Sequence, residues 1–164
     1  MRRLIIVCGF VVALGVNACG QAEQRTGEPG EAPQQPASES ALEVEQESDD
    51  GLAGVFRHDA TTVEFGAAST GEGAANARIT WDEREVTANR DRAKQQFAWS
   101  GGDAVLTTED RTVLRSLARA FQVQWGPAAG GGPSGVADQR DLLLRLSMLL
   151  AEAPLGVPLG DHTG

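Results

Sequence analysis

The sequence predicts a single small α+β domain over residues 53–164, an antiparallel sheet of three to five strands followed by two amphipathic helices packed on one face. Two patterns along the chain carry this prediction. Apolar and polar residues alternate between Val63 and Trp99, as in strands that bury one face. After Gly102 the apolar residues recur every three or four positions, which is the period of an amphipathic helix. Strands followed by helices are typical of α+β domains.

Four apolar pairs mark the expected strands, because the two residues of each pair lie two positions apart. The pairs are Val63 and Phe65, Ile79 and Trp81, Val86 and Ala88, and Phe97 and Trp99. Breaks are expected at Gly71–Ala75 and Ser100–Asp103, and a connection at Asn89–Arg92. Residues 83–96 are also rich in Arg, Glu, Ala and Gln, so a helix remains open as the alternative there.

The first helix is expected to begin at Thr107 or Thr108, where a hydroxyl can cap the open amides and Glu109 and Asp110 suit the positive helix end. It should end at Gly126. Its apolar stripe comprises Val113, Leu114, Leu117, Ala118, Phe121 and Trp125.

The second helix is expected from about Val136 to Ala153, with Pro154 and the residues after it as a stop and no further element beyond. Its apolar face comprises Leu142, Leu143, Leu146, Leu149 and Leu150. The alternative is that one helix face buries only part of these large apolar side chains within the domain, and that the others form a strip that contacts a protein partner.

The segment before the domain is expected to be a disordered acidic tether, because residues 20–52 lack aromatic side chains and are dominated by Glu, Gln, Pro, Ser, Ala and Gly. This segment carries most of the chain's net charge of −9. It is either a charged spacer or a plain soluble linker. Lys94 is the only lysine and there is no basic cluster, which excludes a nucleic-acid partner.

The first residues have the pattern of an export signal. Arg2 and Arg3 precede an apolar run from Leu4 to Val16, which is shorter than the about 20 residues needed to span a bilayer. The run ends at Val16-Asn17-Ala18-Cys19.

That ending resembles the lipobox of bacterial lipoproteins. The resemblance implies a signal peptide over residues 1–18, cleavage before Cys19, acylation of Cys19 with palmitate and a membrane partner reached through this lipid. Gly20 after the cysteine implies delivery to the outer membrane. An ordinary secretory signal cut after Ala18 is the alternative, and it leaves Cys19 as a free thiol.

Motifs that carry chemistry are scarce in this chain. Residues 130–135 formally match a glycine-rich dinucleotide fingerprint, but a helix precedes them where a strand is required. They are therefore interpreted as a linker, and no cofactor is expected. No cysteine follows Cys19, so no thiolate metal site or internal disulfide is possible after it.

Two histidines with acidic neighbours are the remaining candidates for a metal or catalytic site. His58-Asp59 opens the predicted domain and Asp161-His162 closes it. These side chains would reach a ligand set or a general-base pair only if both ends of the domain met, so solvent-exposed side chains are expected instead. A further set of carboxylates, on Glu64, Asp82, Glu83 and Glu85, is expected on the surface.

The aromatic residues have two possible roles. Trp81, Phe97, Trp99 and Trp125 form either the core beneath the helices or an exposed platform for a ligand, and their alternating spacing favours the core. Taken together, the sequence predicts a lipid-anchored cell-envelope protein with a non-catalytic binding or structural module. The alternative is a cell-envelope hydrolase or metal-binding protein that uses His58 or His162.

Overall fold

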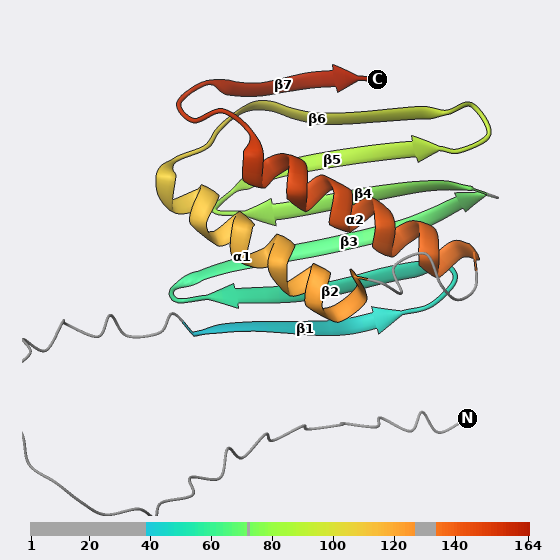
Figure 1. Ribbon diagram of the computed structural model, residues 1–164, viewed down its shortest axis with the longest axis horizontal. Coiled ribbons are helices and arrows are strands. Elements are labelled where there is room, and N and C mark those ends of the chain that lie inside the picture. The colour runs from blue at the N-terminus through green and yellow to red at the C-terminus, as the bar shows by residue number, and fades with distance from the viewer. Residues whose placement is uncertain (1–38, 72, 127–133) are drawn as a thin grey trace, which may run out of the picture. The chain divides into compact units, whose positions relative to one another are not determined.

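In the part of the chain that the structure describes, one antiparallel sheet contains seven strands that follow one another in chain order (Figure 1). A computed structural model describes residues 39–71, 73–126 and 134–164. The strands are β1 (Ser40–Glu47), β2 (Gly51–His58), β3 (Thr61–Gly71), β4 (Ala74–Trp81), β5 (Arg84–Asp91), β6 (Gln96–Val105) and β7 (Pro158–Thr163). Helices α1 (Thr108–Trp125) and α2 (Ser134–Glu152) lie between β6 and β7, and Figure 1 shows both on the same face of the sheet. The predicted α+β class is confirmed, but the sheet has more strands than three to five.

Three strands lie outside the four that the apolar pairs mark. β2 pairs with the first of those four, and β1 and β7 form the two edges of the sheet. β1 falls inside the predicted tether, so the ordered domain begins before Ala53. In β1, half-buried Leu42 and Val44 alternate with exposed Glu43 and Glu45, and the strand pairs with β2. β7 follows the proline-rich stop of α2 and pairs with β6. An edge strand has only one strand neighbour, so short and polar segments suffice for it.

The strand predicted at Val86 and Ala88 is confirmed as part of β5, and the helix alternative for residues 83–96 is wrong, because both side chains are fully buried beneath the helices. Burial on one face thus overrides the helix propensity of the segment. The connection expected at Asn89–Arg92 lies later, at residues 92–95, because β5 continues to Asp91. The expected break at Ser100–Asp103 lies inside β6, where irregular pairing with β7 and a φ of 53° at Gly102 form bulges instead of a turn.

The core lies between the helices and the sheet. Trp81, Trp125, Phe121 and Leu146 are at most 3% exposed, as the apolar patterns predict. Phe97 and Trp99 are only half-buried, because they lie on β6 beyond the strands that α2 covers. The prediction of a core role is therefore confirmed for Trp81 and Trp125 and holds in part for the other two.

Helix α1 begins with a capping box. Thr107 is the N-cap, its hydroxyl accepts a hydrogen bond from the Asp110 amide, and the Asp110 carboxylate accepts one from the Thr107 amide. The same carboxylate accepts hydrogen bonds from Trp81 Nε1 at 3.0 Å and from Arg84 at 2.7 Å. One buried side chain thus joins the helix start to the end of β4 and the start of β5.

Helix α2 packs across β2–β5 and beside α1. Leu142, Leu143, Leu146 and Leu150 are fully buried and Leu149 is half-buried. The expected strip for a protein partner is therefore largely used within the domain.

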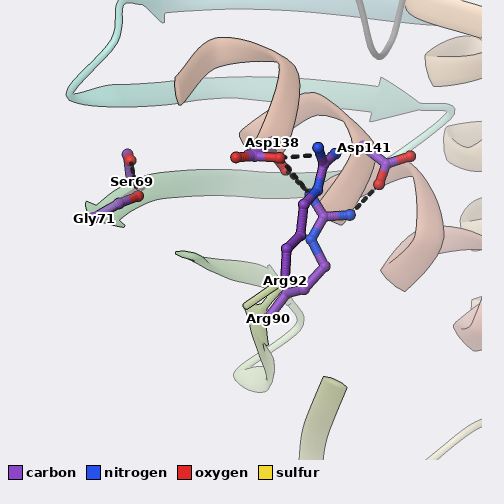
Figure 2. A network of polar contacts seen from close by, with 6 residues as sticks. All are labelled: Ser69, Gly71, Arg90, Arg92, Asp138 and Asp141. Carbon is purple, nitrogen blue, oxygen red and sulfur yellow. Dashed lines mark hydrogen bonds and ion pairs between the residues drawn. The ribbon is translucent and has the colours of Figure 1, made fainter. Parts of the chain in front are cut away.

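A buried ion network fixes α2 to β5 (Figure 2). Asp138 is 2% exposed and pairs with Arg90 at 3.0 Å and with Arg92 at 2.8 Å. Arg90 also pairs with Asp141 and donates to the Asp138 carbonyl oxygen at 3.1 Å. On the other side of the helix, Gln139 donates to the Asp49 carbonyl oxygen at 2.9 Å. These contacts hold α2 on one face of the sheet.

Candidate binding surface

The second face of the sheet is covered by neither helix (Figure 1). Side chains alternate across a strand, so the residues between the buried core positions point to this second face. On β3 and β4 these residues include Glu64, Gly66, Ala68, Asn76 and Arg78. The open face thus carries polar or small side chains, whereas the helix-covered face carries apolar ones.

A shallow hollow of about 560 Å³ lies over β1–β5 and opens onto this face. Small residues line its middle, namely Gly51, Ala53, Gly66 and Ala68. Longer polar side chains line it from β1, β4 and β5, namely Gln46, Asn76, Arg78, Thr87 and Asn89. The floor of the hollow is therefore strand backbone with little side-chain cover, and the side chains around it can form hydrogen bonds.

Strand register brings these residues together from distant parts of the chain. Arg78 on β4 lies opposite Gly66 on β3 and opposite Thr87 on β5. In the neighbouring row, Asn76 lies opposite Asn89. Directly opposed residues on one face have Cβ atoms about 5 Å apart, so their polar groups converge on the same ligand-sized space.

Glycine is not needed on the floor of the hollow to avoid a steric clash. A Cβ atom on Gly66 would lie 3.6 Å from the Leu52 carbonyl oxygen, an ordinary contact. A Cβ atom on Gly51 would be similarly unhindered, at 3.5 Å from Gln46 Nε2. Gly54 differs, because a Cβ atom there would come within 2.3 Å of the Glu43 carbonyl oxygen. Glycine at position 66 therefore keeps the floor open without relieving a clash.

The chemistry of the hollow suits a polar ligand. Side-chain amides of Asn and Gln both donate and accept hydrogen bonds, and Thr87 adds a hydroxyl. Among the described residues that line the hollow, Arg78 is the one that carries a charge, and Glu85 lies 3.7 Å from its guanidinium. Because the exposed pair is screened by water, the guanidinium remains able to exchange Glu85 for a ligand group.

The histidines and their acidic neighbours are not brought together. His58 ends β2 and Asp59 follows it, whereas Asp161 and His162 belong to β7 at one edge of the sheet. Five strand spacings of about 4.8 Å separate β2 from β7, which places the two pairs roughly 24 Å apart. Within the described ranges no group of three or more His, Cys, Asp or Glu side chains is placed to hold a metal ion.

The environments of the two histidines also differ. His58 is only 6% exposed, although a solvent-exposed side chain was expected. His162 stacks on Trp99 with ring centroids 4.3 Å apart and is exposed, as is Asp161. His58 is buried because its side chain lies on the helix-covered face of β2, opposite Ser40.

The four candidate carboxylates are exposed, as expected. Glu64 and Glu85 lie on the open face of β3 and β5. Asp82 and Glu83 form the tight turn between β4 and β5, with φ angles of 42° and 63°. Positive φ at both positions is the geometry of a two-residue hairpin turn, which gives these two residues a structural role.

Two features of the sequence lie outside the residues that the structure describes. They are Cys19 with its preceding signal and most of the glycine-rich segment 130–135. Among the described helices, none is long and apolar enough to cross a membrane.

Sequence reasoning missed the hollow. The available signal was the run of small residues at outward positions of two neighbouring strands, Ala53 on β2 with Gly66 and Ala68 on β3. Such positions in an exposed sheet usually carry Thr or charged residues, as Thr62 and Glu64 do on the same strand.

Comparisons with protein-family models, curated proteins and solved structures give no match.

Proposed function

We propose that the protein is a lipid-anchored component of the bacterial cell envelope whose domain binds a polar ligand on the open face of its sheet. The anchor rests on the signal-like start and on the lipobox resemblance at Val16–Cys19. The outer membrane is the proposed destination, because Gly20 follows the cysteine. No enzymatic activity and no cofactor are part of the proposal.

The hollow over β1–β5 carries the binding role. Its floor is kept bare at a glycine that packing does not require, and its sides offer amides, a hydroxyl and a guanidinium. These groups match a ligand rich in amide and hydroxyl groups, such as a polypeptide backbone or a polyhydroxylated chain. A flat opening over several strands suits a ligand that lies along the surface rather than one that is enclosed.

Replacing Cys19 with alanine tests the anchor. The variant should move from the membrane fraction to the soluble periplasmic fraction, because the acyl chains that hold the protein would be missing. Fractionation of cells that express either form, followed by immunoblotting, measures the change. Identical distributions of the two proteins would refute the anchor and leave the binding face untouched.

A photo-crosslinking amino acid at Asn89 tests the binding face. Benzoylphenylalanine at this position should form a discrete adduct with the ligand in intact cells, because Asn89 lines the hollow and is exposed. The matched control is the same amino acid at Thr62, which is exposed on the same face of the sheet, on β3, but does not line the hollow. Immunoblots of irradiated cells measure the adduct formed from the test position and from the control position.

A second variant links the adduct to the hollow. Gly66→Val should abolish the adduct formed from position 89, since the added side chain fills the floor and valine suits a strand. Thr62→Val, on the same face of β3 but outside the hollow, should leave the adduct unchanged. Equal adducts from positions 62 and 89, or an adduct that survives Gly66→Val, would contradict the proposed face.

The alternative, an envelope hydrolase or metal-binding protein using His58 or His162, is the weaker proposal. A ligand set or general-base pair that combined both histidines would need the two ends of the domain to meet, and four strands lie between β2 and β7.

A further inference from the structure

A second hollow, of about 550 Å³, lies on the helix-covered face between β1 and α1. From the sheet it is lined by Ser40, Leu42 and His58. From α1 it is lined by residues of one face of the helix, namely Thr112, Ser116, Arg119, Ala120, Val123 and Gln124. We name it the β1–α1 groove, and it is separate from the open-face hollow because the sheet lies between them.

His58 is a buried polar group without a complete set of partners in this groove. Its Nδ1 atom is buried and has no hydrogen-bond partner within the described part of the chain. Its Nε2 atom lies 3.8 Å from the nearest Asp59 carboxylate oxygen, beyond hydrogen-bond range. A buried unsatisfied nitrogen costs stability, so its position beside a cavity indicates a group that a ligand satisfies.

The charge of the lining indicates the sign of that ligand. Arg119 is exposed and forms no ion pair with any residue of the described ranges. Among the described residues that line the groove, Arg119 is the one charged side chain and there is no carboxylate. The groove is therefore complementary to an anionic group.

The groove lies along a free strand edge. β1 is the first strand of the sheet order, and its outer edge has no strand neighbour among the described residues. A chain that paired with this edge would direct alternate side chains to the helix-covered face, where the groove lies. Half-buried Leu42 and Val123, which is 82% exposed, would receive apolar side chains.

We propose that the β1–α1 groove binds an extended acidic peptide by strand addition to β1. The peptide backbone pairs with the outer edge of β1, its apolar side chains pack on Leu42 and Val123, and its carboxylates face Arg119 and His58. A second copy of β1 is a poor occupant, because antiparallel pairing of two copies would bring Glu43 and Glu45 of each near those of the other.

Fluorescence anisotropy of a labelled peptide tests this binding with the full chain purified in detergent. The probe is Val-Thr-Asp-Thr-Val-Thr-Asp-Thr with blocked ends, which places two apolar and two acidic side chains on one face of a strand. The same peptide with Asn in place of both Asp is the neutral control. The acidic peptide should bind at least about tenfold more tightly than the neutral one.

Two charge reversals on α1 localise the site. Arg119→Glu should weaken binding of the acidic peptide by about tenfold or more, whereas Arg115→Glu should leave it within about twofold, since Arg115 is exposed on α1 outside this groove. His58→Phe, which keeps a ring but removes both nitrogens, should also weaken binding. Unfolding midpoints of all variants confirm that they are folded.

Several outcomes would overturn the proposal. These are equal binding of acidic and neutral peptides, equal losses from the Arg115 and Arg119 reversals, or no anisotropy change up to millimolar peptide. Gly66→Val should not affect this binding, so failure here and failure of the open-face proposal are distinguishable.

Discussion

Replacing Asp138 with asparagine should lower the free energy of unfolding by about 3 kcal/mol. The carboxylate is almost fully buried and pairs with Arg90, whose side chain is itself only 8% exposed. Without the Asp138 carboxylate, the Arg90 guanidinium stays buried with one negative partner fewer. Leaving a buried charge partly unpaired lowers the free energy of unfolding by more than losing an exposed ion pair does. Asp141 remains beside Arg90 and keeps the loss at the lower end of the usual range. Urea unfolding followed by tryptophan fluorescence measures it.

The control is Asp141→Asn, because this side chain is 42% exposed and contacts the same arginine. Asp141→Asn should lower the free energy of unfolding by less than about 1 kcal/mol. The double variant Arg90→Leu with Asp138→Leu should recover much of the stability, since it removes both buried charges and adds apolar surface. A loss below 1 kcal/mol for Asp138→Asn would mean that the network does not anchor α2.

The helices could be predicted from the sequence because their signals are local. Thr107 and Asp110 form a capping box within four residues, and the stripe through Leu117 and Phe121 repeats over the whole helix. Helix α2 begins at Ser134, near the expected Val136, and its position too was predicted from its own residues. A helix hydrogen-bonds within itself, so its own residues determine most of its extent.

The edges of the sheet could not be predicted in the same way. A strand is completed by a neighbour that is distant in sequence, and an edge strand needs few apolar residues of its own. β1 carries Leu42 and Val44 in a segment whose composition indicates disorder, and β7 follows a proline-rich stop. Only their pairing with β2 and β6 makes them strands.

The candidate sites escaped prediction for a related reason. Gly66 and Arg78 are far apart in sequence, and the register between β3 and β4 makes them neighbours. In the β1–α1 groove, His58 was singled out by residue type, but its burial and its proximity to Arg119 depend on how α1 lies over β1 and β2. Sequence pattern indicates which face of a strand is buried, but not which small or polar residues meet on the other.

Replacing Asp110 with asparagine should lower the free energy of unfolding by about 2 kcal/mol at neutral pH. The carboxylate accepts hydrogen bonds from the Thr107 amide and hydroxyl, from Trp81 Nε1 and from Arg84. An uncharged amide has a single acceptor oxygen for these donors, so at least one of them is left without its partner. The matched control is Glu109→Gln, an exposed residue in the same helical turn, which should change stability by less than about 0.5 kcal/mol.

The loss caused by Asp110→Asn should depend on pH. Burial raises the pKa of Asp110, but the hydrogen bonds from Thr107 and Trp81 and the charge of Arg84 outweigh it and hold the pKa below its usual value. A carboxyl whose pKa is lowered by folding stabilises the native state above its unfolded pKa of about 3.9, and this contribution is lost as the pH falls through the folded value. The difference between wild type and Asp110→Asn should therefore be constant from about pH 7 to pH 5 and shrink below about pH 4. Unfolding curves at each pH measure this difference. A gap that stays constant down to pH 2 would mean that the Asp110 charge does not hold the start of α1 against β4.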